Sequence, residues 1–159
     1  MTNQKPRSDK KWSLYPALHA DVSRLLQEGD LVFKFHSNDL DESYTHEYDT
    51  FVIGQFACRN RGCGAKGWAS KKVAITVRMY QGQRYNARVY HQRCKRCKSL
   101  SRPKLDNSYA ERLSYRIMKW SGIQLDAPFY SRKQGEKPHQ SDLCEGCKAG
   151  HCTGILGDF

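Results

Sequence analysis

The sequence predicts a small α+β fold in which helices pack against a β-hairpin, and three observations lead to it. The 159 residues suit one domain, or one core module with an extension. Residues 73–80 and 84–91 alternate apolar and polar side chains around the turn sequence Gln81-Gly82-Gln83, as hairpin strands do. Two further segments, one before and one after this hairpin, repeat apolar residues at helical spacing.

The apolar content is low for a chain of this length. Counting Gly but not Tyr, apolar residues make up about 40% of the chain, below the roughly 45–50% that is usual. We therefore expect the fold to need a further source of stability, and the seven Cys are the obvious one. No stretch approaches the ~18 apolar residues that span a bilayer, so no integral membrane segment is expected.

The cysteines are expected to be reduced. Residues 1–11 are polar and basic and lack the apolar stretch of a secretory signal. An odd number of Cys without such a signal argues against a disulfide framework. The sequence therefore favours a cytoplasmic or nuclear protein, in which clustered reduced thiols usually bind metal.

The N-terminal third is expected to be a disordered tail, residues 1–12, followed by a helical and acidic extension, residues 13–48. A helix is predicted over residues 16–28, because Pro16 is a favoured first-turn residue and Gly29 follows the segment. Its apolar residues recur at helical spacing; they are Leu18, Val22, Leu25 and Leu26.

A short strand is predicted over residues 31–35, and the acidic segment 38–49 is predicted to be a loop. The simpler interpretation is that this loop is exposed. The alternative is that it packs against the basic part of the chain, or shields that part until a partner arrives.

The central hairpin is predicted to have two unlike faces. A three-residue loop pairs Tyr80 with Arg84, Arg78 with Asn86 and Thr76 with Arg88. One face is apolar and is expected to face the core; it carries Val73, Ile75, Val77, Met79, Tyr85, Ala87 and Val89. The other face is basic and aromatic; it carries Thr76, Arg78, Tyr80, Arg84, Asn86, Arg88 and Tyr90.

A second helix is predicted over residues 109–120. Ser108 and Glu111 have the spacing of a capping box, and Gly122 is a natural stop. Its apolar stripe is interpreted as core rather than as a ligand platform; it consists of Tyr109, Leu113, Ile117 and Trp120. Residues 126–140 are predicted to be a loop.

Two thiol pairs flank the predicted hairpin. Cys58 and Cys63 precede its first strand, and Cys94 and Cys97 follow its second strand. Folding the hairpin brings the two pairs together, and four thiolates suit the tetrahedral geometry of zinc. This arrangement is typical of a zinc ribbon.

The remaining thiols form a second group with Cys144, Cys147 and Cys152. A fourth ligand is needed, and His139 gives the compact spacing H-x4-C-x2-C-x4-C. His151 and His91 are alternatives, but neighbouring residues such as His151 and Cys152 rarely both reach one ion without strain, and His91 lies nearer the first site, so His139 is favoured. His139 as an ordinary surface residue also stays open.

Two zinc ions would use all seven Cys and one His, and each would contribute on the order of 10 kcal/mol to folding. The predicted fold is therefore a zinc-ribbon-like hairpin with packed helices, stabilised by two structural zinc sites. The zinc-binding domain is expected over residues 49–153, with a C-terminal tail over 154–159.

The charge of the chain is uneven. The formal net charge is +11, yet the segment up to Phe51 has six basic and nine acidic residues. Between Cys58 and Lys104 there are fourteen Lys or Arg and no Asp or Glu. A high density of charge of one sign destabilises a folded protein through self-repulsion. It favours the binding of a polyanion, because each neutralised phosphate releases counterions. The alternative is a solvated face that only keeps the protein soluble.

Taken together, these motifs resemble the three-CxxC zinc-finger family, which includes the receptor-transporting proteins and, more distantly, the zygote-arrest RNA-binding proteins. The resemblance covers about residues 49–152, and its first pair is C-x4-C rather than CxxC. It implies zinc binding at Cys58, Cys94, Cys97, Cys144 and Cys147. The matching segments are residues 54–58, 68–70, 73–75, 92–97, 138–139 and 143–152.

The resemblance implies either of two roles. Receptor-transporting proteins are trafficking adaptors that typically carry a C-terminal membrane segment, and this sequence ends without one. Zygote-arrest proteins use their zinc module on RNA, which fits the acid-free basic stretch better.

We therefore expect a binding protein for nucleic acid, with single-stranded RNA favoured. Arginine and lysine side chains would contact phosphates, and two tyrosines would stack on unpaired bases, unless both tyrosines pack within the sheet. These residues are Arg78, Tyr80, Arg84, Arg88, Tyr90, Lys95, Arg96 and Lys98. The alternative is a protein-interaction adaptor whose partner has an acidic surface.

A catalytic role is not expected. Two closed four-ligand sites leave no position for the water that catalytic zinc needs. The sequence has no HExxH or HxE arrangement, P-loop, GxGxxG or GxSxG. If His139 were not a ligand, the second site would be open and a hydrolytic role would return.

Overall fold

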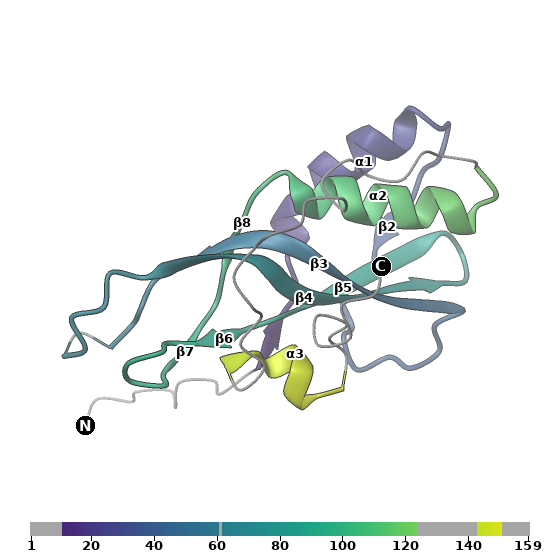
Figure 1. Cartoon of the computed structure of the whole chain (residues 1–159). Coiled ribbons are helices and arrows are strands. Elements are labelled where there is room, and N and C mark those ends of the chain that lie inside the picture. The colour runs from purple at the N-terminus through teal and green to yellow at the C-terminus, as the bar shows by residue number, and fades with distance from the viewer. Residues whose placement is uncertain (1–10, 61, 124–142, 151–159) are drawn as a thin grey trace, which may run out of the picture.

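A computed structural model describes residues 11–60, 62–123 and 143–150, which form a curled sheet with helices on both faces (Figure 1). The main sheet has the strand order β1-β5-β4-β3-β8, with β2 also paired to β5, and β6 pairs with β7 in a second sheet. The strands are β1 (Trp12–Ser13), β2 (Lys34–Phe35), β3 (His46–Phe56), β4 (Trp68–Tyr80), β5 (Arg84–Tyr90), β6 (Gln92–Arg93), β7 (Leu100–Ser101) and β8 (Lys104–Leu105). The helices are the 3-10 turn η1 (Pro16–Leu18), α1 (His19–Gln27), α2 (Ser108–Trp120) and α3 (Glu145–Lys148).

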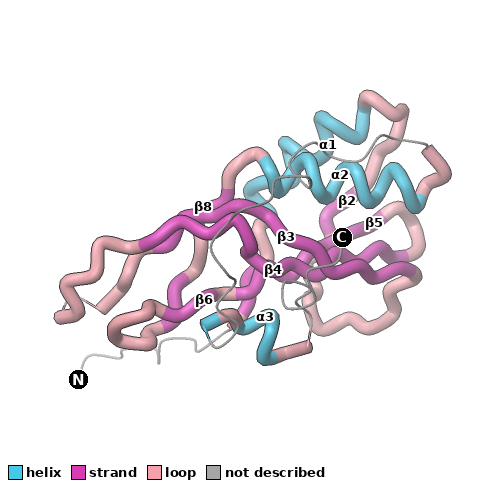
Figure 2. Tube along the Cα trace, viewed as in Figure 1, coloured by secondary structure: helices cyan, strands magenta, loops and turns pink. Residues whose placement is uncertain are grey.

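The hairpin β4–β5 has the predicted register, with Tyr80 opposite Arg84 and Thr76 opposite Arg88. The positive φ angles of Gly82 and Gln83 close the three-residue turn. The apolar face of the hairpin is the main core, as predicted, and Figure 2 shows α1 and α2 lying side by side over it. No helix in the described ranges is both long enough and apolar enough to cross a bilayer.

The two long helices lie close to their predicted positions. Val22 and Leu26 of α1 are fully buried, and the predicted helix begins as the 3-10 turn at Pro16. In α2, Tyr109, Leu113 and Ile117 are core residues as expected, whereas Trp120 is only partly buried at the edge.

The predicted capping box does not form. The Ser108 hydroxyl instead accepts a hydrogen bond from the Ile53 amide at 2.8 Å, which ties α2 to β3. The Ser108 amide is satisfied by the carboxylate of Asp106, also at 2.8 Å. The start of the helix is therefore set by Asp106 and by a tertiary contact.

The eleven-residue strand β3, next to β4 in the main sheet, was not predicted from the sequence. Its first residues, 46–49, had been assigned to the acidic loop. Phe51 and Val52 are both buried because the sheet is covered on both faces, so the alternation that marks a half-exposed strand is weak here. Of the strand predicted over residues 31–35, only Lys34 and Phe35 pair, in parallel with β5.

The N-terminal segment is integrated into the same body. Trp12 and Ser13 pair with the end of β5, and α1 packs against α2. The expected extension over residues 13–48 therefore shares its sheet and its core with the rest of the chain. The loop predicted over residues 126–140 lies outside the described residues.

Candidate metal centre

Two connections between strands, at one end of the sheet, bring four thiols together. The β3–β4 connection carries Cys58 and Cys63, and the β6–β7 connection carries Cys94 and Cys97. All four sulfur atoms lie within 4.8 Å of one another. The Sγ atoms of Cys58 and Cys97 are 3.5 Å apart, and those of Cys63 and Cys94 are 3.7 Å apart.

These distances fit a tetrahedral zinc ion. With Zn–S bonds of about 2.3 Å, tetrahedral geometry places the sulfur atoms about 3.8 Å apart. Four thiols are also the softest donor set that a protein offers, and such a set selects zinc over hard cations. The β-hairpin thus brings the two pairs to one point, as the sequence predicted.

Hydrogen bonds to sulfur prepare the cluster for a cation. The hydroxyl of Ser99 lies 3.0 Å from Cys97 Sγ and, together with the Ser99 amide, lowers the pKa of Cys97 to about 6. The backbone amides of Cys97 and Arg96 lower the pKa of Cys94 in the same way. Both effects favour the thiolate, the form that binds metal.

The pKa of Cys63 shifts in the opposite direction. A backbone hydrogen bond from Ala65 favours the Cys63 thiolate, but desolvation and the three neighbouring thiols outweigh it and raise its pKa to about 11. Four negative charges cannot share so small a volume without a counter-charge. The cluster therefore gains its full charge only with a cation at its centre.

Glycine allows the first knuckle to turn back onto the sheet. Gly67 has a φ of 93°, and a Cβ atom here would lie 2.3 Å from the Phe56 carbonyl oxygen. Only glycine fits that approach. The stacked rings of Phe56 and Trp68, 5.0 Å apart, close the strand pair just before the thiols.

The C-terminal thiol group is described only in part. Cys144 is buried and immediately precedes α3, and Cys147 is half-buried within α3. The other predicted ligands, His139 and Cys152, and the alternative His151 lie outside the described residues. His91 is buried and its Nε2 atom is 2.7 Å from the Ser13 hydroxyl.

A buried ion pair connects the two thiol groups. Arg93 donates from Nε to Glu145 Oε1 at 2.7 Å and from Nη1 to the Lys98 carbonyl at 2.9 Å. Glu145 is 1% exposed and stands between Cys144 and Cys147 in the chain. Arg93 therefore joins the knuckle of Cys94 and Cys97 to α3.

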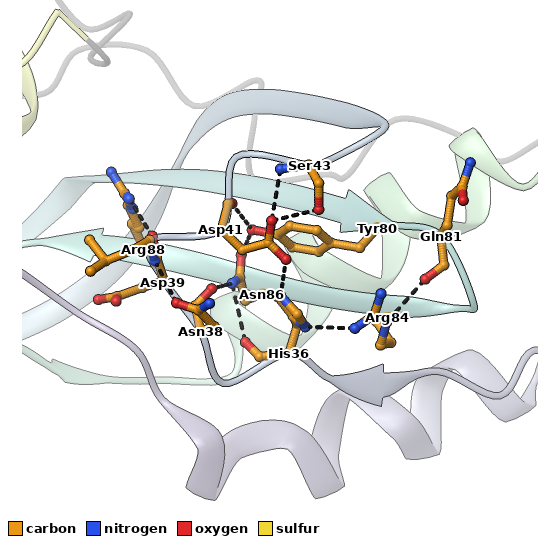
Figure 3. Close-up of polar contacts among 11 residues, drawn as sticks. His36, Asn38, Asp39, Asp41, Ser43, Tyr80, Gln81, Arg84, Asn86 and Arg88 are labelled. Carbon is orange, nitrogen blue, oxygen red and sulfur yellow. Dashed lines mark hydrogen bonds and ion pairs between the residues drawn. The ribbon is translucent and has the colours of Figure 1, made fainter.

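The basic and aromatic face of the hairpin is covered, so the expectation of an open surface there is wrong. Tyr80 and Tyr90 are each 2% exposed, and Arg78 is 7% exposed. One cover is α3, which packs on β4. The other is the segment 36–44, called the strap below, which crosses β4 and β5 (Figure 3).

The strap binds this face mostly through its own carbonyl groups (Figure 3). Tyr80 donates to the Asp41 carbonyl at 3.0 Å, and Asn86 donates to the His36 carbonyl at 3.1 Å. Arg88 donates to the Asp39 carbonyl and lies over the Trp12 ring. Both tyrosines therefore pack within the fold, the alternative that sequence analysis had left open.

The remaining predicted contact residues are open to solvent. Lys95, Arg96 and Lys98 are exposed, and Arg84 is half-buried beside His36. Arg59 and Lys66, which sequence analysis did not select, are also exposed on the first knuckle. The absence of acidic residues between Cys58 and Lys104 was the signal that could have identified them.

A comparison with protein families matches residues 51–150 to the model of a 3CxxC-type zinc ribbon, described as a zinc-binding domain. The searches of curated proteins and of solved structures found no match. The matched segment begins in β3 and ends just after α3, so it includes both thiol groups up to Cys147.

Proposed function

The chain belongs to the 3CxxC zinc-ribbon family of zinc-binding domains, and from this premise we propose that it binds single-stranded nucleic acid, preferably RNA, beside its zinc site. We call the contact surface the ribbon end, namely residues 57–67 and 93–99. Its exposed cations are Arg59, Lys66, Lys95, Arg96 and Lys98.

One zinc ion is proposed at Cys58, Cys63, Cys94 and Cys97, where four thiols fill all four positions. This closed donor set supports a structural rather than a catalytic metal. A second ion is proposed at Cys144, Cys147, Cys152 and His139. Native mass spectrometry tests the count: the wild type should carry two ions, and the variant Cys144→Ser plus Cys147→Ser should carry one.

The observation that carries the nucleic-acid proposal is the one-signed charge of the ribbon end. Its exposed Lys and Arg have no acidic residue between Cys58 and Lys104 to neutralise them. Phosphates would provide that neutralisation, and released counterions would drive binding. The knuckles hold these side chains on turns fixed by the thiols, so the surface is organised before the ligand arrives.

The test is the variant Arg96→Gln plus Lys98→Gln, measured by fluorescence anisotropy with an unstructured RNA over a range of salt concentrations. If each residue neutralises one phosphate, binding should weaken and the salt slope should fall by about 1.4. The matched control is Arg24→Gln plus Lys34→Gln, which removes two exposed charges elsewhere. If both variants weakened binding equally, the affinity would depend only on the net charge of the protein, and a specific contact at the ribbon end would be refuted.

The alternative role is a protein adaptor whose partner has an acidic surface, and the same exposed cations favour it. Affinity capture from cells with and without nuclease separates the two. Partners that stay bound after nuclease treatment and are lost with Arg96→Gln plus Lys98→Gln would support the adaptor and exclude RNA as the direct ligand.

A further inference from the structure

A second basic and aromatic surface lies where α2 runs beside the outer half of β3. Three contacts of similar spacing connect the two elements. Arg112 Nη1 donates to Thr50 Oγ1 at 3.4 Å, and the Arg116 guanidinium lies 3.4 Å from the centre of the Tyr48 ring. The rings of His46 and Trp120 are 5.1 Å apart. We call these six residues the ladder.

The spacing of helix and strand explains the ladder. Alternate strand residues point to one face and advance about 6.8 Å, while every fourth helix residue advances about 6.0 Å. His46, Tyr48 and Thr50 are alternate residues of β3, and their partners in α2 are spaced by four. The step along the strand and the step along the helix are therefore similar, so the contacts can repeat along both elements.

Two cations of α2, Arg116 in the ladder and Lys119 beside it, lack an acidic partner among the described residues. The only acidic residue of α2 is Glu111, in its first turn. Arg116 and Lys119 form no ion pair with any residue in the described ranges, and Arg116 Nε is buried without a hydrogen-bond partner there. Arg112 and Arg116 are also like charges four residues apart, which destabilises a helix. Within the described ranges, the charge of Arg116 is therefore left without an ion-pair partner.

The ladder is accessible at the edge of the sheet. Tyr48 is 40% exposed, and Lys119 and His46 are exposed. On the outer side of β3, strand β8 pairs only with Gly54 and Gln55. The half of β3 that carries Tyr48 therefore has β4 as its only strand neighbour among the described residues.

We propose that the ladder is a second contact surface for the same single-stranded RNA, an inference that rests on the proposed function. Apart from the buried Nε of Arg116, a guanidinium stacked on a ring can offer its terminal Nη N–H groups as a fork to a phosphate. Tyr48, Tyr115 and Trp120 supply rings for base stacking around Arg116, which lies 5.9 Å from Tyr115 and 6.0 Å from Trp120. Rings interleaved with cations suit a nucleic acid better than an acidic peptide, which would need the cations alone.

The ribbon end and the ladder lie at opposite ends of β3, so one RNA must be long to contact both. Eleven residues of strand correspond to about 36 Å. A short oligonucleotide can occupy either surface separately, whereas a long one gains affinity from contacting both. The number of short RNA molecules bound per protein, and the dependence of affinity on RNA length, therefore report on the ladder independently of the ribbon end.

The experiment compares RNAs of about 4 and about 16 nucleotides, the range of sites on single-strand-binding folds. The test variant is Tyr48→Ala plus Arg116→Gln, and Arg24→Gln is the charge-matched control. For the short RNA, the wild type should bind two molecules and the test variant one. For the long RNA, the test variant should bind about tenfold more weakly, while the control keeps wild-type affinity.

Two further measurements keep the result interpretable. The milder variant Arg116→Lys keeps the charge and loses the fork, so it should give an intermediate loss if the test variant misfolds. In a variant in which Trp12 and Trp68 are replaced by Phe, Trp120 is the only tryptophan, and binding of the long RNA should quench its fluorescence.

Unchanged stoichiometry and affinity in the ladder variants, with binding still lost in the ribbon-end variant, would overturn the ladder and leave the proposed function standing. No RNA binding by the wild type would refute both. A nuclease-resistant protein partner that is lost with the ladder variants would make this surface a protein interface and overturn the inference.

Discussion

Ser99 controls the charge of one sulfur atom in the metal centre. Its hydroxyl and amide both stabilise the Cys97 thiolate, so the pKa of this thiol falls to about 6, from an ordinary value near 8.5. Metal binding requires deprotonated thiols and therefore weakens as pH falls. A single hydroxyl would thus extend the pH range over which the proposed centre binds zinc.

The variant Ser99→Ala should lose zinc at higher pH than the wild type. Without the hydroxyl the pKa of Cys97 rises, so protons compete with the metal at a higher pH, while the amide of residue 99 keeps part of the effect. A metal-indicator titration across pH measures the midpoint of release. Ser121→Ala, which removes a hydroxyl at the end of α2, is the control, and an equal shift in both variants would contradict the argument.

Gly146 lets α3 approach the sheet. A Cβ atom at this position would lie 2.4 Å from the Cβ of Ala74 and 3.4 Å from the Tyr90 ring. Gly146→Ala should therefore lower the free energy of unfolding by about 1–3 kcal/mol through overpacking. Urea unfolding measures this change. Gly62→Ala, whose added methyl meets only Asn60 at 3.6 Å, should cost far less.

At the scale of elements, the strap accounts for the covered face of the hairpin. Its acidic side chains do not pair with the arginines of that face: Asp41 accepts from the Ser43 amide and from His36 Nε2, each at 2.8 Å, and Asp39 accepts from Trp12 Nε1 at 3.1 Å. The basic face is instead satisfied by strap carbonyls and by Glu47, which pairs with Arg78 at 2.8 Å. The strap is therefore a structural cover of this face.

Acid should loosen the strap. Hydrogen bonds from Ser43 and then the interaction with His36 lower the pKa of Asp41 to about 2, from an ordinary value near 3.9. A depressed carboxyl pKa contributes stability that is present above the ordinary value and is lost as pH falls toward 2. The protection of the amides of residues 38–43 against hydrogen exchange should fall as the pH is lowered from about 4 to about 2. In the variant Asp41→Asn, this protection should already be lower at neutral pH. Protection that stays constant in both conditions would contradict this assignment.

The elements differ in how far the sequence predicts them. The hairpin register follows from local alternation and a three-residue turn, so Thr76, Arg78 and Tyr80 were paired correctly. The cover of that face depends on a segment about forty residues earlier in the chain, and no local pattern reports such a contact. The meeting of the first two thiol pairs was predictable because it follows from the hairpin alone. Helical spacing predicts Trp120 in the core because it cannot show that β3 begins beside it, at His46.

At the scale of the whole molecule, stability has two sources in different places. The main core fills the space between the sheet and the two long helices, and it contains Val22, Leu26, Ile75, Leu113 and Ile117, all fully buried. None of the described residues between 57 and 67 belongs to that core. The sequence suggested an undersized core that depends on metal, and from the position of the main core we infer that the dependence on the first proposed zinc ion is mainly at the ribbon end.

Removal of zinc should therefore unfold the molecule in two stages. Chelation leaves four thiols close together without a counter-charge, with the pKa of Cys63 raised and the pKa of Cys97 lowered, so the turns that carry the two thiol pairs should open first. Ile75 and Leu113 should keep their amide protection, because the core between the sheet and the helices does not use the metal. Hydrogen exchange with and without chelator measures both regions in one experiment, and readdition of zinc should restore the ribbon end. A single cooperative loss of protection across both regions would show instead that the metal organises the entire fold.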